Sequence, residues 1–570
     1  MKNIRFFLMA NLCFVLLLSC MSPLIGRKTE IAVCINNPLD SLKFPQTGQN
    51  SSRLLLDIKN QTIQVTATSD GETVGPISIS KSNDGSYKGS IELTVGKTWT
   101  IIAEALAPSK KAYVRAEQTI EVSSNASPVK LVLEPAPEYP IFFAGADDWP
   151  DVIGGLRFFE DISKDNPAII VFTENINLAG TSIELEEKHL YITSQGPART
   201  LTFNTTTADN HSFNIPTDSS LYLSNIIIQG SDSGAGKRLI YINGGSCTLG
   251  RGAVLTGNKN EIDGSILEGG GVYIEGNDSR LTMEEGSKIE NCSSRYGGGV
   301  CQYGGEFIFK NAIINNCRAV VQSAPLGAGG AVYVSPLISA EYNFTASGGS
   351  ISGFATNHGG AIYIAFGSSK KTISLSNLTI SGTAGDGFGG GIYCMQIPVV
   401  AESCDIILTN CSIKESIAKS ESTAGWGGGV FMRNVNLELK ECTIESCEAT
   451  QYGGGIYADM GSNIILNNST ISGCSAIGTG TGTGGGIYLD AATIEFECPA
   501  NYTVFSDNDS YYPAKNLYGY GLGNTSTSYI TRINTNSSPG EKTIQDFLIG
   551  ISNGEVEEET FDDYFAFSSP

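Results

Sequence analysis

The chain of 570 residues carries 36 basic and 58 acidic side chains, so its formal net charge is −22 at pH 7. A negative surplus of this size repels phosphate backbones and anionic lipid headgroups, which excludes nucleic-acid binding as the main activity. Only 16% of the residues are charged, 67 are glycine and the mean hydropathy is −0.02. This composition is typical of a folded, turn-rich β protein and not of a disordered chain.

Residues 1–19 have the pattern of an export signal. Lys2 and Arg5 precede an apolar run over residues 6–18, which is too short to cross a bilayer because that takes roughly 20 apolar residues. The run ends in Leu-Leu-Ser before Cys20, and this ending resembles the lipobox of bacterial lipoproteins. The resemblance implies lipidation of Cys20 and a membrane partner, at the bacterial outer membrane and the cell surface. An ordinary cleavable signal with a chance cysteine is the alternative.

Residues 20–137 contain short alternating segments such as TIQVTAT, SIELTV and TIEVSS, separated by Asp-Gly, Gly-Lys and Ser-Asn turns. Such spacing predicts a small β-sandwich. Cys34 is the only cysteine between residues 30 and 135, so the sandwich is expected to be immunoglobulin-like in architecture only. We expect it to act as a spacer that follows the anchor.

Residues 138–166 are expected to form a linker and a capping helix. The PAPEYP segment that leads into them is stiff, because each proline fixes φ and removes a hydrogen-bond donor. Between residues 149 and 164, apolar side chains share one helical stripe: Ile153, Leu156, Phe159 and Ile162. Such a helix would cover the open first edge of the β-structure that follows.

Residues 167–510 are expected to form the repeat region, and within it, between residues 269 and 486, a glycine pair followed by Gly or Ala recurs at intervals of about 30 residues. The third residue of these triplets is Gly271, Gly299, Ala331, Ala361, Gly391, Gly429, Gly455 and Gly486. This period accommodates three short strands and three bends, which predicts a right-handed parallel β-helix whose coils rise by about 4.8 Å. The predicted fold class is therefore all-β, a solenoid preceded by the sandwich, with residues 511–570 as a C-terminal cap or tail.

Each repeat also has a turn residue three places before a branched aliphatic residue. The aliphatic residues are Ile228, Leu255, Ile289, Ile314, Ile351, Ile380, Ile413, Ile444 and Ile471. The turn residues are Asn225, Gly252, Gly286, Asn311, Gly348, Asn377, Asn410, Glu441 and Asn468. Asn and Gly adopt positive φ most readily, so a tight bend is expected at this place in every repeat, with Glu441 as the compositional exception.

The period of two in a strand sorts the residues after each triplet into an inner and an outer set. The aliphatic residues are expected to face inward, as at Val272 and Ile274. The aromatic residues between them face outward in one column, interrupted by Cys301: Tyr273, Tyr333, Tyr363, Tyr393, Phe431, Tyr457 and Tyr488. Flat rings beside glycines can pack on sugars or peptide, so this column is the candidate binding site. The alternative is that the rings only cover the coils and stack on one another.

Phe354-Ala355-Thr356-Asn357 followed directly by HGGAI places an F-x-x-N element beside GGA(I/V). This pairing resembles the repeats of the polymorphic outer-membrane protein family, and the resemblance covers roughly residues 220–510. Members of that family are surface β-helices, many implicated in adhesion, so the resemblance implies a β-helix and a surface role. In this chain the Phe slot, three residues after the aliphatic landmark, often holds cysteine: Cys292, Cys317, Cys447 and Cys474. A lipid at Cys20 would take over the role of the family's membrane-spanning barrel.

No catalytic motif, cofactor or metal site is predicted. The three histidines share no metal-binding spacing: His189, His211 and His358, the last of which precedes a glycine pair as polar residues before turns often do. Asp459 and Asp490 hold the same place in successive coils and come nearest to the paired carboxylates of a glycan-cleaving enzyme. Solvated surface carboxylates are the favoured interpretation of that pair. Stacked cysteines such as Cys411 and Cys442 are expected to be buried thiols and not disulfides.

These patterns together predict a surface lipoprotein that is not an enzyme. Its β-helical rod is expected to bind a host glycan or matrix protein in the manner of an adhesin. The alternatives are a β-helical polysaccharide lyase or hydrolase, and a purely structural surface protein.

Overall fold

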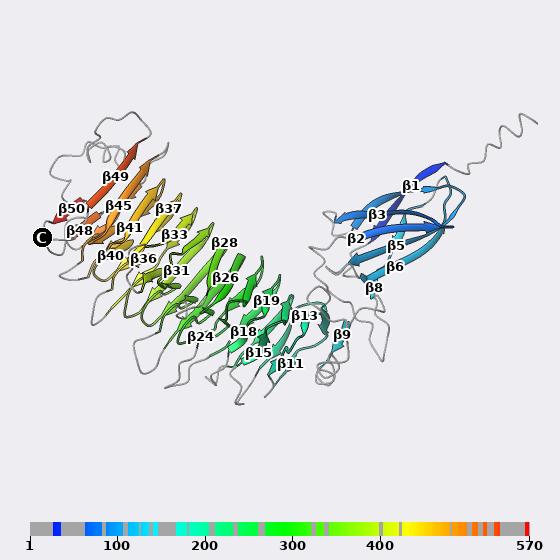
Figure 1. Ribbon diagram of the computed structural model, residues 1–570, viewed down its shortest axis with the longest axis horizontal. Coiled ribbons are helices and arrows are strands. Elements are labelled where there is room, and N and C mark those ends of the chain that lie inside the picture. Colours follow the sequence, from blue (N-terminus) through cyan, green and yellow to red (C-terminus); the bar gives the residue numbers. More distant parts are fainter. Residues whose placement is uncertain are drawn as a thin grey trace, which may run out of the picture. The chain divides into compact units, whose positions relative to one another are not determined.

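The computed structural model describes residues 27–35, 63–81, 87–106, 112–124, 127–135, 141–145, 167–178, 182–203, 211–231, 238–259, 268–320, 327–335, 341–397, 403–420, 425–478, 482–498, 504–510, 517–520, 529–535 and 565–568. The chain divides into two compact units, one holding the N-terminal sandwich and the other the solenoid (Figure 1). Residues 1–19, Cys20 and the capping helix expected between residues 149 and 164 lie outside the described residues.

The N-terminal unit is a sandwich of mostly antiparallel strands in the order β7-β1-β4-β3-β2-β5-β6-β8. Strand β3 joins the two sheets, because Ile79 pairs with Ile63 of β2 while Lys81 pairs with Tyr87 of β4. Alternate side chains of β2 are buried, and Trp99 is fully buried with its indole N–H donated to the Thr94 carbonyl oxygen over 3.2 Å. The strands are β1 (Lys28–Ile35), β2 (Ile63–Ser69), β3 (Glu72–Lys81), β4 (Tyr87–Thr94), β5 (Thr98–Leu106), β6 (Ala112–Glu121), β7 (Val129–Leu131) and β8 (Glu134–Pro135).

One wall of the solenoid is a 13-stranded parallel sheet to which each coil contributes one strand (Figure 1). The aliphatic residues expected to face inward, such as Val272 and Ile274, are fully buried. Burying each of these side chains stabilises the fold by about 1.5–3 kcal/mol. The strands are β12 (Ile183–Glu184), β15 (His211–Pro216), β18 (Arg238–Asn243), β21 (Val272–Glu275), β25 (Val300–Gln302), β27 (Val332–Val334), β29 (Ile362–Phe366), β32 (Ile392–Gln396), β36 (Val430–Arg433), β40 (Ile456–Asp459), β44 (Ile487–Asp490), β48 (Leu517–Tyr520) and β50 (Phe565–Ser568).

The other walls are also parallel and in register, and they close around the same interior. The first set holds β13 (His189–Ser194), β16 (Ser220–Leu223), β19 (Ser246–Leu249), β22 (Arg280–Met283), β30 (Thr372–Ser376), β33 (Cys404–Thr409), β37 (Val435–Lys440), β41 (Asn463–Asn467), β45 (Thr493–Cys498) and β49 (Tyr529–Thr535). The second holds β11 (Ile176–Asn177), β14 (Arg199–Thr202), β17 (Ile226–Gln229), β20 (Ala253–Thr256), β23 (Lys288–Glu290), β31 (Thr379–Ala384), β34 (Ser412–Lys414), β38 (Thr443–Glu445), β42 (Thr470–Ser472) and β46 (Val504–Ser506).

Two long strands, β26 (Gly305–Ala319) and β28 (Tyr342–Ala355), run through the corner between these walls and pair in both. Short strands continue the second wall toward the glycine triplets: β24 (Ser293–Ser294), β35 (Ile417–Ala418), β39 (Glu448–Ala449), β43 (Ser475–Ala476) and β47 (Asp509–Ser510). Strands β9 (Ile141–Ala144) and β10 (Ala168–Phe172) come before the regular coils. The predicted fold class is confirmed, and β48, β49 and β50 extend the parallel pairing beyond the expected boundary at residue 510.

Each position of the glycine triplet excludes larger residues for a different physical reason. Gly453, the first glycine of one triplet, has a φ of 63°, in the left-handed region that favours glycine. A Cβ on Gly454 would lie 2.4 Å from the carbonyl oxygen of Gly485 in the next coil, so a side chain has no room there. A Cβ on Gly455 would lie 2.5 Å from the Gly486 carbonyl oxygen and 3.2 Å from Cγ2 of Ile471, so alanine fits there only if the backbone shifts.

The bends predicted from the second landmark are present in every repeat. All nine turn residues have positive φ, and Glu441, with a φ of 54°, adopts the same conformation as its asparagine neighbours. The stacked backbones therefore impose this conformation even on a residue for which it costs roughly 1 kcal/mol. Two of these asparagines also bond to each other across neighbouring coils, since Asn410 Nδ2 donates to Asn377 Oδ1 over 2.7 Å.

The third triplet residue faces a small interior slot in the same coil. The slot residues follow one another in register along the solenoid: Cys292, Cys317, Gly353, Gly382, Ser416, Cys447 and Cys474. The expectation that Phe354 shares this slot with the cysteines is wrong. Gly353 pairs with Cys317, and Phe354 pairs with Arg318, whose guanidinium carbon lies 4.8 Å from the centre of the Phe354 ring.

The sizes of the third triplet residue and of the slot residue compensate for each other: where one is larger, the other is smaller. Four triplets that end in glycine face Cys or Ser, as Gly429 faces Cys447 and Gly391 faces Ser416, whereas Ala331 faces Gly353 and Ala361 faces Gly382. A Cβ on Gly353 would lie 2.6 Å from the Ala331 backbone nitrogen, so the two segments approach each other closely in that coil. The slot cysteines are thus explained by their size.

The eleven cysteines whose side chains the structure describes are free thiols, in agreement with the expected thiol stacks. In the slot they donate to nearby carbonyl oxygens, as Cys447 does to Glu445 and Cys474 to Ser472, over 3.4 Å in both cases. Hydrogen bonding to Cys447 and burial hold the pKa of the Cys474 thiol well above its usual range. The Cys474 thiol is therefore a poor nucleophile.

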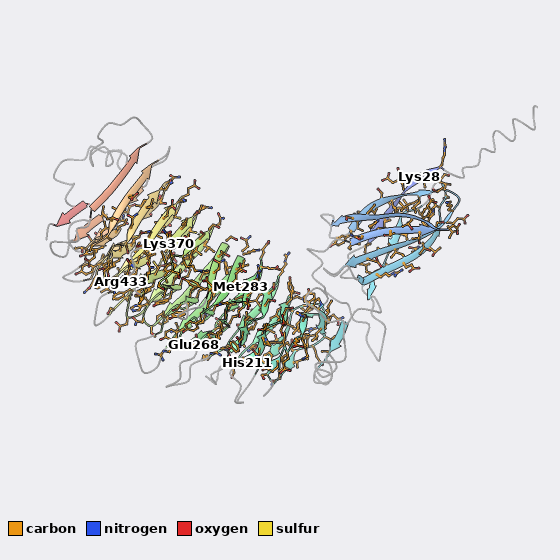
Figure 2. The ribbon with its side chains drawn as sticks, in the orientation of Figure 1. Lys28, His211, Glu268, Met283, Lys370 and Arg433 are labelled. Carbon is orange, nitrogen blue, oxygen red and sulfur yellow. The ribbon has the colours of Figure 1, made fainter. Side chains whose placement is uncertain are left out.

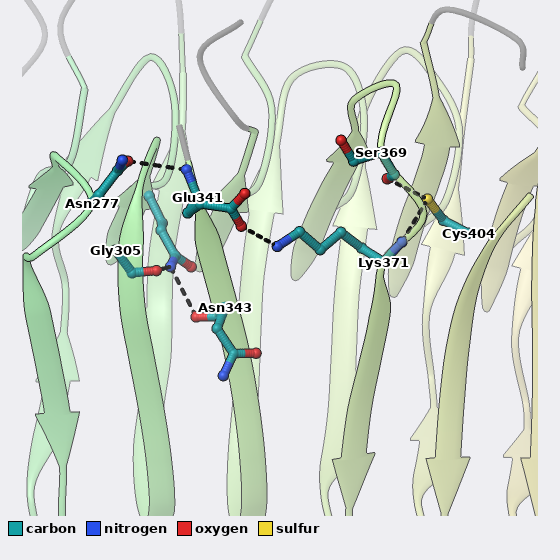
Figure 3. A network of polar contacts seen from close by, with 8 residues as sticks. Asn277, Gly305, Glu341, Asn343, Ser369, Lys371 and Cys404 are labelled. Carbon is teal, nitrogen blue, oxygen red and sulfur yellow. Dashed lines mark hydrogen bonds and ion pairs between the residues drawn. The ribbon is translucent and has the colours of Figure 1, made fainter. Parts of the chain in front are cut away.

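A polar network ties successive coils at the corner that follows the 13-stranded sheet (Figure 3). The buried Gln302 amide donates to the Asn343 carbonyl oxygen over 3.0 Å, one coil further on. Nearer the surface, Lys371 Nζ lies 2.6 Å from Glu341 Oε2, and the Lys371 backbone N–H donates to Cys404 Sγ over 3.3 Å. The buried amide fixes the corner, while the exposed ion pair adds little because water screens it.

The exchange of volume predicts non-additive stabilities for Gly455 and Cys474. In Gly455→Ala the new Cβ lies 2.5 Å from the Gly486 carbonyl oxygen and 3.4 Å from Cys474 Sγ, and overpacking of this kind costs about 1–3 kcal/mol. Adding Cys474→Gly removes the slot side chain, so the two backbone segments can rearrange around the new methyl group. Ala331 and Ala361 already face a glycine in this way. The double variant is expected to lose about 1 kcal/mol less than the sum of the single losses in urea denaturation. Additive losses would contradict the exchange.

Candidate functional site

The predicted aromatic column forms on the outer face of the 13-stranded sheet. Its seven rings, here called the ring column, occupy paired positions of successive strands: Tyr273, Tyr333, Tyr363, Tyr393, Phe431, Tyr457 and Tyr488. Cys301 interrupts it as expected. From Tyr333 onward the rings stack almost parallel, with centroids 4.7 Å apart for Tyr333 and Tyr363 and 5.3 Å apart for Tyr457 and Tyr488.

The ring column is much less accessible than a binding site of exposed rings would be. Six of the seven side chains are only 1–9% exposed, and Tyr363 is partly exposed. Because each ring lies against the next, a ligand reaches ring edges and not ring faces. Stacking of a sugar on these rings is therefore not available, and the column acts first as a cover for the coils beneath it. Its role in binding stays a prediction.

A second set of rings, which was not among the predicted site residues, lies over the ring column. This outer ring row consists of the residues that directly precede the glycine pairs: Tyr296, His358, Phe388, Trp426 and Tyr452. Each is partly exposed, and each packs against a ring of the next coil. The ring centroids of Trp426 and Tyr457 are 4.9 Å apart, and those of His358 and Tyr393 are 4.8 Å apart. The recurrence of an aromatic residue before GG was the signal that could have revealed it.

His358 belongs to this row as a ring and not as an acid or base. It stacks on Phe388 with the centroids 4.9 Å apart, and its Nδ1 accepts the Phe388 backbone N–H over 3.2 Å. Burial, with a smaller contribution from the Arg433 charge, lowers the pKa of His358 to about 4. The imidazole is therefore neutral at pH 7.

Asp459 and Asp490 lie in register, as predicted, but the interpretation as solvated surface carboxylates is wrong for Asp459. That side chain is 5% exposed, and Arg433 of the preceding coil binds Asp459 Oδ2 through Nη2 at 2.5 Å and Nε at 2.6 Å. Burial nevertheless raises the pKa of Asp459, while the guanidinium opposes that rise. Asp490 accepts the Tyr457 hydroxyl over 3.0 Å. The sequence pattern does not indicate Arg433, because no basic residue recurs at its position.

A second polar cluster lies earlier on the same face. The Arg238 guanidinium carbon is 4.0 Å from the centre of the Tyr273 ring, and Arg238 Nη2 lies 3.4 Å from Glu268 Oε2. The Tyr303 hydroxyl donates to Glu268 Oε1 over 3.1 Å. Figure 2 shows His211, Glu268 and Arg433 along the same side of the solenoid. The outer face thus combines a strip of rings with arginine–carboxylate clusters near its two ends.

No group of three or more His, Cys, Asp or Glu side chains among the described residues could hold a metal ion. The described segments also contain no helix that is long and apolar enough to span a membrane. No family model matches the chain, and neither a curated protein nor a solved structure matches it.

Acid is expected to destabilise the solenoid through His358. The unfolded imidazole takes up a proton near pH 6.5, whereas the folded ring resists protonation down to about pH 4, so this stability is full above pH 6.5 and is lost as the pH falls toward 4. His358→Phe keeps the stacked ring but removes the proton site. The variant should lose less stability between pH 7 and pH 4 than the natural chain, by on the order of 2–3 kcal/mol. Thermal melts across this range measure the effect, and parallel profiles for the two chains would refute it.

Proposed function

We propose that this chain is a lipid-anchored surface protein of a bacterium whose solenoid displays the outer ring row to a host glycan or matrix protein. The observation that carries the proposal is the strip of partly exposed rings from His358 to Tyr452, one in each successive coil. Tyrosine and tryptophan are frequent anchors of interfaces because they combine a large apolar surface with a polar group.

The surroundings of the strip support this use. The ring column beneath it supplies a rigid floor, so little side-chain entropy is lost on binding. The clusters around Arg433 and Glu268 place charged and polar groups beside the apolar strip, which is the usual arrangement of an interface with an apolar centre and a polar rim. The resemblance to the polymorphic outer-membrane protein repeats, many of whose members are implicated in adhesion, points the same way.

Binding is expected to depend on the outer ring row and not on other walls. A screen of the purified protein against glycans and matrix proteins identifies a ligand, and Trp426→Ala with Tyr452→Ala should weaken its binding at least about tenfold, the equivalent of 1.4 kcal/mol. Tyr222→Ala is the matched control, because Tyr222 is a partly exposed ring on the wall of β16. Circular dichroism checks that the variants remain folded. Unchanged affinity in the double variant would remove the strip from the site.

The anchor is tested separately at Cys20. Replacing Cys20 by Ala is expected to move the protein from the detergent phase of a Triton X-114 separation to the aqueous phase, because an acylated N-terminus partitions with the detergent. Ser19→Ala, which keeps the cysteine, serves as the control. Equal partitioning of the natural chain and Cys20→Ala would contradict lipidation.

A glycan-cleaving activity is the second candidate. The arrangement that favours it is the row Arg433, Asp459, Asp490 in three consecutive coils, in which burial raises the pKa of both carboxyls, since perturbed carboxyls beside a basic group are common in active sites. The close ion pair of Arg433 with the buried Asp459 speaks for a structural role instead. Release of reducing ends or unsaturated products from acidic glycans, lost in Asp490→Asn, would favour the enzyme.

A further inference from the structure

Trp426 occupies a special place among the rings of the outer face. It is partly exposed, whereas Trp99 of the sandwich is fully buried. Its ring stacks on Phe388 at 4.6 Å and on Tyr457 at 4.9 Å, with interplanar angles of 14° and 22°. Its indole N–H donates to Gln451 Oε1 over 3.0 Å. The side chain thus joins the surface to the buried ring column by direct ring contact.

The hydroxyls of Tyr457 and Tyr393 have different hydrogen-bond partners. The ring is 2% exposed, and the hydroxyl donates to Asp490 Oδ2 over 3.0 Å. The Tyr393 hydroxyl, two coils earlier, donates to the Met395 thioether over 3.1 Å. A carboxylate accepts a proton readily, and a thioether does not. Trp426 contacts two phenols: Tyr452, with ring centroids 5.9 Å apart at 42°, and Tyr457, which is closer and more nearly parallel. The closer phenol is therefore one whose proton has a base to move to.

The hydrogen-bond acceptors of the Trp426 indole and the Tyr457 phenol determine which of the two rings holds the radical after one electron is lost. A phenol that loses one electron becomes so acidic that it is stable only as a neutral radical, after its proton has left. An indole that loses one electron beside a neutral amide keeps its proton and stays a strongly oxidising radical cation. Gln451 offers Trp426 only an amide oxygen, whereas Asp490 offers Tyr457 a carboxylate. The deficit therefore moves from the indole to the phenol.

We propose that Trp426 and Tyr457 form a radical-transfer pair that draws oxidising equivalents from the surface into the ring column. A one-electron oxidant of the peroxide-derived radical class takes an electron from Trp426 and is reduced. The Trp426 radical cation then takes an electron from Tyr457, and the phenol proton passes to the Asp490 carboxylate. Trp426 is restored, and the product is a neutral Tyr457 radical beside a protonated Asp490.

The geometry of the acceptor favours this end point. Burial raises the pKa of Asp490, and the nearby Asp459 charge raises it further, so the carboxylate is a better proton acceptor than an exposed aspartate. Burial also shields the Tyr457 radical from solvent and from other chains. The pair can thus hold a radical away from the surface, a property that adhesion does not require.

The chain contains a matched control pair on another wall. The Tyr222 hydroxyl donates to Glu284 Oε2 over 3.0 Å, the same distance as in the Tyr457–Asp490 pair. Its ring contacts the Tyr191 ring edge-on at 4.9 Å and 87°. Tyr222 therefore has a base for its proton, and its ring contact is with another phenol and not with an indole.

The test uses the purified full chain and photogenerated tris(bipyridine)ruthenium(III) as the one-electron oxidant. Freeze-quenched samples are examined by electron paramagnetic resonance, and transient absorption follows the indole and phenoxyl bands. The natural chain should give a neutral tyrosyl signal that rises as the indole signal decays. Tyr457→Phe, which keeps the stacked ring, should lose most of the tyrosyl signal and lengthen the life of the indole signal. Tyr222→Phe should leave both unchanged.

Two further variants separate electron transfer from proton transfer. Asp490→Asn removes the base and is expected to slow formation of the tyrosyl radical at least about tenfold, a modest share of what a positioned base contributes. Glu284→Gln is its control and should have no effect on the rate. Trp426→Phe should slow the appearance of the Tyr457 radical. An undiminished tyrosyl signal in Tyr457→Phe, or equal rates in the natural chain and Asp490→Asn, would overturn the proposal.

Discussion

The close approach of one coil's backbone to the next at the glycine triplets governs the rest of the solenoid. The carbonyl oxygen of Gly485 lies where a Cβ of Gly454 would be, so the coils can stack only if that position has no side chain. Once the backbones are in register, every repeated residue becomes part of a column whose spacing is the rise of the coil, about 4.8 Å. The rings then stack because the backbone holds them near the separation that offset aromatic rings prefer.

This constraint also explains the chemistry of the outer face. Rings that cover one another offer few polar contacts. The arginine–carboxylate clusters of the outer face lie near the two ends of the strip of rings. Arg433 and Asp459 are buried together because each would be costly alone in such surroundings. The outer ring row lies outside the ring column, and its side chains are partly exposed. Accessible aromatic surface is therefore concentrated in the row and not in the column.

The sequence predicted those features that local backbone chemistry dictates. The period, the inward aliphatic residues and the bend at Glu441 follow from steric rules that act within one repeat or between identical repeats. Arg433 was not predictable in this way, because it occurs once and acts across a coil boundary. The outer ring row was missed because its members differ in type, being Tyr, His, Phe and Trp. In addition, Glu268, Ala328 and Thr483 replace the ring at the same place in other coils.

The error at Phe354 has a definite geometric cause. Asn316 and Ser446 have positive φ at a second bend, two residues after the aliphatic landmark, whereas β28 passes the equivalent place without such a bend. The count of residues therefore shifts by one, and Gly353 falls where other coils have cysteine. Counting along the sequence cannot reveal this shift, because it depends on whether the chain bends or continues straight.

The exchange between triplet and slot has a consequence for how such a chain lengthens. The two coils with Ala opposite Gly, at Ala331 and Ala361, are adjacent, and coils with Gly opposite Cys or Ser lie on both sides of them. A duplicated coil with Ala opposite Gly fits beside another coil of that kind, because their cross-sections match. Beside a coil with Gly opposite Cys or Ser, the cross-sections differ. A duplication that copies whole blocks of one kind of coil therefore preserves this packing, whereas a duplication that mixes the two kinds disturbs it.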